Sequence, residues 1–367
     1  MESQCVRKEV QESFNDKVVL VTGGAGAIGS NLVKALNNFG TKRIIILDDL
    51  SSSYEWNIPT GEKISFIKGS ILDDEKLKVS FQGKPDIVYH LAAHFANQNS
   101  VDHPEMDLTV NGMGILKVLE CSRRVGVERF IYASSGCGIY GADSKMPFEE
   151  NDVSMKLYTP YQVTKMLGEL YTNYFYNLYH LPIVNARLFN SYGPGEVPGK
   201  YRNVIPNFFL WSMNGQPLPI TGTGDETRDF TYVEDIVNGL LPMAYCEDAV
   251  GEAFNLATGQ EIKIGDLASW VNELAGNKAG IVFKERRNWD RKNRLLASIE
   301  KARRILGYEP KMDFRAGLVH VYRWFVENWE DIEQSSDFTN EIVPKPQVFA
   351  EEIVRVQGKS LNVEHVQ

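Results

Sequence analysis

The 367-residue sequence has few cysteines and histidines, and their spacing fits neither a disulfide framework nor a metal site. The four cysteines, at positions 5, 121, 137 and 246, lack the paired spacing of zinc ligands or of disulfide-rich secreted domains. His90 and His94 are four residues apart, but His90 ends an apolar segment and the residues after it are typical of a loop. We therefore expect reduced thiols, a cytoplasmic location and no bound metal.

Long apolar runs and concentrated positive charge are also missing. No apolar run reaches the roughly 18 residues that a membrane span needs, and the first nine residues lack the apolar core of a signal peptide. The net charge is −9, and no stretch is rich in lysine and arginine. We therefore expect neither a membrane nor a nucleic acid as a partner.

A glycine-rich turn follows the first apolar segment, at residues 18–21. The sequence Thr22-Gly-Gly-Ala-Gly-Ala-Ile-Gly29 contains G-x-G-x-x-G and leads into a helical pattern at 28–39. Glycines allow the tight turn and the approach of a pyrophosphate, which then lies at the positive N-terminus of the helix. A second apolar segment, 43–47, ends at Asp48, about twenty residues after Gly29, where a carboxylate binds ribose hydroxyls. Because a carboxylate repels a 2′-phosphate, we expect NAD rather than NADP.

Apolar and helical segments alternate along the first half of the chain. Such alternation predicts an α/β fold with a Rossmann-type doubly wound parallel sheet. A smaller, discontinuous substrate-binding lobe is expected from the change in the sequence after residue 190. The apolar segments are 18–21, 43–47, 64–67, 86–91, 129–134 and 182–189, and the main helical patterns are 28–39, 110–125 and 161–179. Polar or small residues after several of these segments should meet at one cleft, at the carboxyl ends of the strands.

The composition of the sequence changes after residue 190. Residues 191–199 are rich in proline and glycine, and the whole stretch 191–234 is predicted to be irregular. We expect four parts: an N-terminal extension, a cofactor-binding domain, a substrate-binding lobe and a polar tail. Their bounds are 1–15, 16–190 plus 235–259, 191–234 plus 260–330, and 331–367.

A tyrosine and a lysine occur at helical spacing in Tyr161-Gln-Val-Thr-Lys165. Residues four apart share a helix face, so the phenol and the ammonium should stand side by side. Pro160 suits the first turn of that helix. An adjacent ammonium and a positively charged nicotinamide ring would both favour the phenolate, so Tyr161 is a candidate base. Lys165 could also hydrogen-bond the nicotinamide ribose.

Together these motifs make the chain resemble the extended short-chain dehydrogenases/reductases, in particular the nucleotide-sugar epimerases and dehydratases similar to UDP-galactose 4-epimerase. The likeness covers about residues 16–329 and includes Leu47-Asp-Asp-Leu-Ser51, His90-Leu-Ala-Ala93, Arg187-Leu-Phe-Asn-Ser-Tyr-Gly-Pro-Gly195 and Thr227-Arg-Asp-Phe-Thr231. The resemblance implies that Tyr161 is the base and Lys165 its partner, and that the enzyme is a homodimer formed through helices near 110–125 and 161–179.

The resemblance also assigns binding roles by position. The expected NAD contacts are Gly23, Gly26, Ala27, Ile28, Gly29, Asp48, Ser70, Ile71, Leu91, Ala92 and Ala93, together with Tyr161 and Lys165. The expected contacts of the nucleotide-diphosphosugar substrate are Asn190, Asn203, Val204, Arg228 and Arg287. Ser70 stands where an aspartate is usual in the family, so one adenine contact should come from Ser70 or from Ile71.

One segment departs from the family pattern, Ala133-Ser-Ser-Gly-Cys-Gly-Ile-Tyr-Gly141. Counting four residues back from Tyr140 gives Gly136, whereas one extra residue at Gly138 would make Ser135 the catalytic hydroxyl, which we favour. Cys137 would then resemble the acid/base cysteine of GDP-mannose 3,5-epimerases. Gly136, Cys137 and Gly138, which follow Ser135, supply no carboxylate, and this argues against a 4,6-dehydratase or a decarboxylating enzyme.

The sequence therefore predicts an NAD-dependent epimerase that acts at C4 of a nucleotide sugar through a transient 4-keto intermediate. Two alternatives stay open. The first is a GDP-sugar 3,5-epimerase, or a C4 dehydrogenase, that uses Cys137. The second is a catalytically inactive cofactor-binding protein of the same fold.

Overall fold

Seven apolar segments form one parallel sheet in the order β11-β6-β5-β4-β1-β2-β3. The computed structural model describes residues 10–141 and 144–336. The strands are β1 (Val18–Thr22), β2 (Arg43–Asp48), β3 (Ile64–Lys68), β4 (Ile87–His90), β5 (Arg129–Ser135), β6 (Ile183–Leu188) and β11 (Ala253–Leu256). The strand order reverses between β1 and β4, which is where ligands bind in open parallel sheets. The predicted Rossmann-type α/β class is confirmed.

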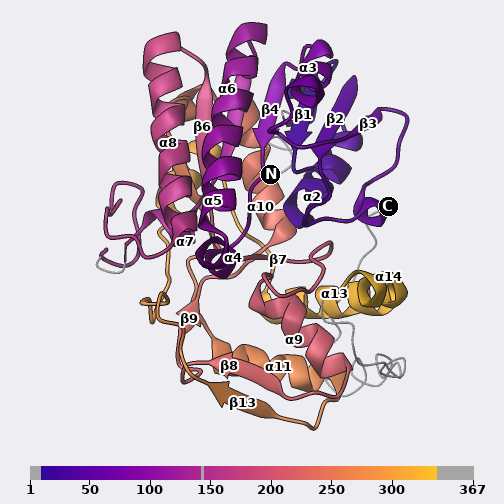
Figure 1. Ribbon diagram of the computed structural model, residues 1–367, viewed down its shortest axis with the longest axis vertical. Coiled ribbons are helices and arrows are strands. Elements are labelled where there is room, and N and C mark those ends of the chain that lie inside the picture. The colour runs from indigo at the N-terminus through magenta and orange to yellow at the C-terminus, as the bar shows by residue number, and fades with distance from the viewer. Residues whose placement is uncertain (1–9, 142–143, 337–367) are drawn as a thin grey trace.

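Helices cover both faces of this sheet (Figure 1). Val19 and Val21 of β1 pack in one apolar cluster with α2 and α10, whereas Leu20 packs in another with α3, α6 and α8. This division follows from the strand itself, because alternate side chains point to opposite faces. The helices are α2 (Ala27–Asn37), α3 (Asp74–Gln82), α6 (Gly114–Val125), α8 (Pro160–Tyr179) and α10 (Val233–Leu240).

Short elements complete this part of the chain. After β2 comes the 3₁₀ turn η1 (Glu55–Asn57), and after β4 come α4 (Asn97–Asp102), α5 (Pro104–Asp107) and the π-helical turn η2 (Leu108–Met113), which continues into α6. The others are α7 (Gly136–Ile139), η3 (Pro242–Ala244), η4 (Glu247–Ala249) and α12 (Glu300–Leu306). No helix in the described part of the chain is both long and apolar enough to cross a membrane.

A smaller lobe lies beneath the carboxyl ends of the strands in Figure 1. Its helices α9, α11, α13 and α14 surround a third apolar cluster, separate from the two on the sheet. They are α9 (Val204–Met213), α11 (Ile264–Ala275), α13 (Phe314–Glu327) and α14 (Trp329–Ser335). Three two-stranded pairs connect them: β7 (Ser191–Tyr192) with β10 (Thr231–Tyr232), β9 (Thr227–Arg228) with β12 (Ile262–Lys263), and β8 (Leu218–Thr221) with β13 (Ile281–Lys284).

The prediction that 191–234 is irregular was wrong. This stretch contains the ten-residue helix α9 and the strand β8. The sequence of α9, Val-Ile-Pro-Asn-Phe-Phe-Leu-Trp-Ser-Met, is apolar on nearly all sides, and most of its residues are buried. A helix buried all round shows no polar face, so its sequence carries no helical periodicity.

The observed elements bear on the expected four-part division, which we retain as a proposal. Residues 1–9 of the expected N-terminal extension lie outside the described residues, whereas Val10 and Phe14 are buried against the sheet cluster. At the other end, α14 spans the expected lobe boundary at residue 330, and Ile332 packs in the lobe cluster. The expected tail beyond residue 336 lies outside the described residues.

Candidate active site

One pocket runs along the carboxyl ends of the central strands, from the glycine turn to α8. All residues that the sequence analysis named as cofactor contacts line it, and so does Ser135. These residues come from the turn after β1, from the ends of β2, β3, β4 and β5, and from α8. The structure therefore brings the predicted cofactor-binding and catalytic residues together in a single cleft.

The glycine turn has the conformation that its sequence predicts. Gly23 has φ +73°, and a Cβ placed there would lie 2.6 Å from the backbone nitrogen of Ala92. A Cβ on Gly29 would lie 2.2 Å from the carbonyl oxygen of Gly23. No side chain caps the start of α2 at Gly26. The first-turn N–H groups of α2, which have no partner inside the helix, can therefore bind an anion.

Asp48 connects the end of β2 to the glycine turn. Its Oδ2 accepts a hydrogen bond from the Ala25 backbone nitrogen (3.0 Å), and its Oδ1 accepts from the Leu50 nitrogen (2.9 Å) and the Ser53 hydroxyl (2.7 Å). The carboxylate is nearly buried but still lines the pocket. It thus holds the turn and can also accept hydrogen bonds from a ligand's hydroxyl groups.

Tyr161 and Lys165 lie on the first turns of α8. The Thr159 hydroxyl caps this helix by accepting from the Gln162 nitrogen (3.3 Å), and Pro160 occupies the first helical position. Tyr161 is buried, and the Ser135 hydroxyl lies close enough to influence the pKa of its phenol. Lys165 Nζ donates to the carbonyl oxygen of Ala133 (2.8 Å) and lies 5.6 Å from the centre of the Tyr161 ring.

Burial shifts the pKa of both groups toward their uncharged forms. It raises the pKa of Tyr161 above the usual value, with the Ser135 hydrogen bond acting in the opposite direction. Burial also lowers the pKa of Lys165 to about 8. The adjacent ammonium of Lys165 therefore does not lower the pKa of Tyr161 below its usual value in the protein without NAD. A positively charged nicotinamide ring beside Tyr161 would add the missing stabilisation of the phenolate.

The end of β5 decides between Ser135 and Gly136 as the residue that faces the cleft. A Cβ on Gly136 would lie 1.9 Å from the Phe189 ring, so position 136 points into the core and has no room for a side chain. Ser135 and Cys137 line the pocket, whereas Gly136 does not. The Ser135 hydroxyl also accepts from the Gly138 nitrogen (3.1 Å) and thereby caps α7. This geometry supports the extra-residue interpretation of the sequence.

Cys137 occupies the place where the cofactor pocket meets a second pocket. Its Sγ donates to Asn190 Oδ1 (3.4 Å), and burial raises the pKa of the thiol. Asn190, at φ +27°, donates its Nδ2 to the carbonyl oxygen of Asp229 (2.8 Å). Both residues line both pockets, so a ligand that bridges the two must pass beside the thiol.

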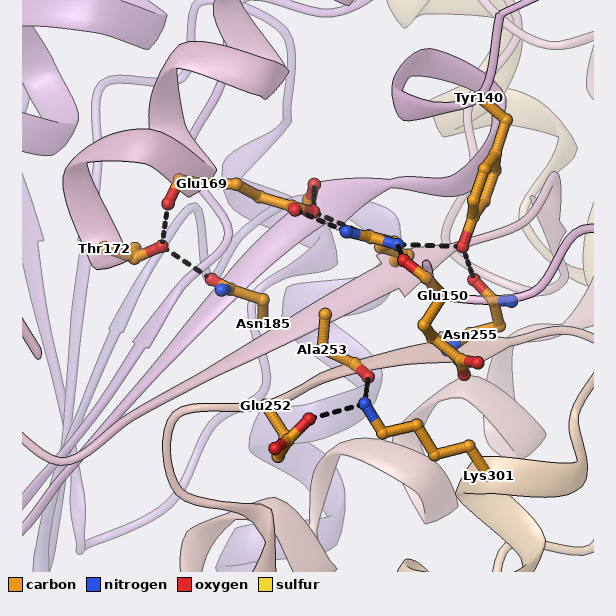
Figure 2. A network of polar contacts seen from close by, with 11 residues as sticks. Tyr140, Glu150, Glu169, Thr172, Asn185, Glu252, Ala253, Asn255 and Lys301 are labelled. Carbon is orange, nitrogen blue, oxygen red and sulfur yellow. Dashed lines mark hydrogen bonds and ion pairs between the residues drawn. The ribbon is translucent and has the colours of Figure 1, made fainter. Parts of the chain in front are cut away.

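A buried ion pair fixes α8 against the strand ends (Figure 2). Arg187 on β6 binds both carboxylate oxygens of Glu169, through Nε (2.9 Å) and Nη2 (2.7 Å). The Ser134 hydroxyl donates to the same carboxylate (2.6 Å). Arg187 Nη1 also donates to the Tyr140 hydroxyl (3.0 Å), which in turn donates to Asn255 Oδ1 (2.6 Å). The network therefore links the helix of Tyr161 to the strand that ends at Ser135.

The second pocket lies between the sheet and the smaller lobe. Its lining includes all the predicted substrate contacts, namely Asn190, Asn203, Val204, Arg228 and Arg287. Arg228 forms an ion pair with Asp290 (3.2 Å), and the Arg287 guanidinium lies 5.6 Å from the centre of the Trp289 ring. Both arginines thus line the pocket wall with their positive charge.

Sequence reasoning missed several residues of this region. Lys292 donates to the carbonyl oxygens of Cys137 (2.9 Å) and Tyr140, and Trp289 donates to Gln98 Oε1 (2.8 Å) across the two lobes. Glu196 is buried beside Asn203, which donates to it (2.8 Å), and burial raises its pKa to about 7. These residues belong to no motif, and only the folded chain brings them to the pockets.

The chain is similar in sequence and in structure to several known proteins. The model of the NAD dependent epimerase/dehydratase family matches residues 19–257. The UDP-glucose 4-epimerase of Mycolicibacterium smegmatis is 33% identical over 310 residues, which cover 83% of this chain and 97% of that protein. Among solved structures, an epimerase of Methanothermobacter thermautotrophicus has 63% identity and a TM-score of 0.91, covering 92% of this chain and 100% of that one. A UDP-glucose 4-epimerase of Thermotoga maritima, solved with UDP-glucose, has 32% identity and a TM-score of 0.80, covering 85% and 99%.

Proposed function

The chain belongs to the NAD-dependent epimerase/dehydratase family, and from this premise we propose that it inverts the configuration at C4 of a nucleotide-diphosphosugar. It is an enzyme of the epimerase type with NAD as its cofactor. The observation that carries the C4 assignment is that Tyr161, Lys165 and Ser135 line one pocket together, beside Cys137, where that pocket meets the second one.

The residues of the first pocket fit NAD. The uncapped N-terminus of α2 suits the pyrophosphate, Asp48 suits ribose hydroxyls, and Lys165 stands near Tyr161 to hold the second ribose. When bound, NAD supplies a reversible hydride acceptor beside the sugar. The remaining steps are the work of side chains of this chain.

Tyr161 accepts the proton of the C4 hydroxyl as C4 is oxidised, and later returns it to the oxygen on the other face. Ser135 donates a hydrogen bond to the same oxygen and so holds it beside the phenol. Between these two events the 4-keto sugar rotates and presents its other face, while the diphosphate stays bound to Arg228 and Arg287. Residues of the smaller lobe line the second pocket, which holds the diphosphate.

The surroundings of Ser135 favour epimerisation over dehydration. The carboxylates that line the two pockets are Asp48, Asp49, Glu196, Glu226 and Asp290. Each of these carboxylates accepts a hydrogen bond from the protein or forms an ion pair with it. None of the three residues directly after Ser135, which are Gly136, Cys137 and Gly138, carries a carboxylate, and a dehydratase would need one there to expel the C6 hydroxyl. A 3,5-epimerase would use Cys137 as an acid/base, but burial disfavours its thiolate.

We further propose a homodimer formed through α8 and the η2–α6 segment, which pack side by side (Figure 1). On α8, Val163, Leu170 and Leu178 are each more than half exposed, and so are Met106 and Leu108 on the adjoining turns. An apolar stripe of this kind on two neighbouring helices is typical of a four-helix interface. Of the aromatic residues near this face, Tyr174 and Tyr179 are exposed but Phe175 is core. The described cysteines are free thiols, which supports a cytoplasmic location.

Product analysis in deuterated water tests the C4 proposal. The holoenzyme is incubated with UDP-glucose, and the products are separated and examined by NMR. We expect the C4 epimer without solvent deuterium on any sugar carbon, because the hydride leaves and returns within the site. Deuterium at C3 or C5 would instead indicate a 3,5-epimerase, and a 4-keto-6-deoxy product would indicate a dehydratase.

A further inference from the structure

Lys292 places a positive charge on the lining of the second pocket. The residue lies in the loop between β13 and α12, is half-buried, and lines the second pocket. Its Nζ donates to the carbonyl oxygens of Cys137 and Tyr140, which follow Ser135 at the end of β5. The amine is thereby held beside the segment that carries the catalytic hydroxyl.

Within residues 10–141 and 144–336, this ammonium has no anionic partner. Among the described residues, no carboxylate oxygen lies within ion-pair distance (4.0 Å) of Lys292 Nζ. Asp290 is nearby, but its two oxygens are held by Arg228. Two carbonyl oxygens occupy two of the three donor positions of the ammonium, which leaves one for another acceptor. Burial and the Arg228 charge lower the pKa of Lys292 to about 8, so an anion there would be stabilising.

The sugar of the substrate must lie close to this amine. Its C4 hydroxyl meets Tyr161 and Ser135 in one pocket, whereas its diphosphate meets Arg228 and Arg287 in the other. Cys137 lines both pockets at the point where the sugar crosses. Because Lys292 binds the backbone of Cys137, its amine lies beside the place where the two pockets meet. Of the two carbons next to C4, C5 carries the C6 substituent, which is a carboxylate in a uronic acid.

We propose that Lys292 binds a carboxylate on the sugar, and that the preferred substrate is a nucleotide-diphospho-uronic acid. This inference rests on the proposed C4 epimerisation and adds the substrate class to it. Arg228 and Arg287 match the two negative charges of the diphosphate, and Lys292 matches a third at C6. A neutral hexose would leave the buried ammonium facing a hydroxymethyl group, which offers hydrogen bonding but no charge.

Paired substrates and paired variants test the proposal. The kcat/KM of the holoenzyme is measured for UDP-glucuronate and UDP-glucose, in wild type, Lys292→Met and Lys292→Arg. We expect wild type to favour the acid by at least about tenfold, which corresponds to one charge-assisted interaction. We expect Lys292→Met to lower this acid-to-neutral ratio by at least about tenfold, and Lys292→Arg to keep most of it. Lys263→Met is the control: Lys263 is exposed, pairs with Asp225 and lines neither pocket, so the ratio should not change.

Two results would overturn the proposal. One is a wild-type ratio near or below one. The other is an equal loss of activity on both substrates in Lys292→Met, which would mean that the amine only positions the Cys137–Tyr140 segment. If neither sugar is epimerised, the C4 proposal fails, but the binding inference is still decided by calorimetry. In the Tyr161→Phe holoenzyme, UDP-glucuronate should bind at least about tenfold more tightly than UDP-glucose, and Lys292→Met should remove that difference.

Discussion

The buried Arg187–Glu169 pair leads to a prediction about both stability and catalysis. Glu169→Gln keeps the shape of the side chain but removes its charge, leaving Arg187 buried beside a neutral amide. Both side chains are nearly inaccessible to solvent, at 5% and 7% exposure, and the pair is bidentate. Removing one partner of such a buried pair costs roughly 3–5 kcal/mol, because the remaining charge is uncompensated.

This cost converts to a measurable shift in melting temperature. A chain of this length unfolds with an entropy of roughly 0.7 kcal/mol/K, so the loss corresponds to about 4–7 °C in Tm. Differential scanning calorimetry of Glu169→Gln measures it. We also expect kcat to fall, because Glu169 holds the helix of Tyr161 against the strand that ends at Ser135.

Glu128→Gln is the matched control for this change. Glu128 pairs with Lys17 at 2.6 Å, a distance as short as those of the buried pair, but the carboxylate is 56% exposed. Exposed ion pairs contribute about 0–1 kcal/mol, so Tm should fall by no more than about 1–2 °C. Equal shifts in the two variants would refute the argument that burial, rather than the mere presence of an ion pair, gives Glu169 its importance.

Three further predictions concern the base, the cofactor and the dimer. Tyr161→Phe should lower kcat by at least about 10²-fold while NAD and sugar-nucleotide affinities stay within about threefold, since only one hydroxyl is lost; turnover near the wild-type rate would exclude a tyrosine base. Asp48→Asn should narrow the preference for NAD over NADP by removing the charge that repels a 2′-phosphate. Equilibrium binding of both cofactors measures this preference. An unchanged ratio of the two affinities would mean that Asp48 does not contact the ribose. Leu170→Glu should convert a dimer into a monomer in light scattering after gel filtration, because it places a charge in the exposed stripe of α8; the exposed Glu273→Lys on α11 should not.

The sequence predicts the sheet well because its signals are local. Each strand of the first half is a short apolar run, and each lies within one or two residues of its predicted bounds. The glycine turn is also local, since Gly23 and Gly29 are required by contacts within the turn and with the next strand end. Such positions can be read from spacing alone.

The smaller lobe and much of the second pocket could not be predicted in the same way. Helix α9 is apolar all round, so only its tertiary surroundings reveal it as a helix. Lys292 lies in a segment crowded with other charges, and nothing in the sequence distinguishes it from its exposed neighbour Arg291. Its contact with Cys137 joins residues 155 positions apart, which a reading of spacing along the chain cannot detect.

Ser135 shows how a steric fact bears on a question that counting left open. The family count placed Gly136 at the catalytic position, but Phe189 fills the space where its side chain would be. We therefore expect opposite effects from two small changes. Ser135→Ala should lower kcat by at least about tenfold, through loss of one hydrogen bond to the reacting oxygen, and change Tm little. Gly136→Ala should lower Tm, because overpacking of this kind costs about 1–3 kcal/mol, and its effect on kcat should be the smaller of the two. If Ser135→Ala left kcat unchanged while Gly136→Ala abolished it, the hydroxyl would not be Ser135, and the loop would have to present residue 136 to the sugar.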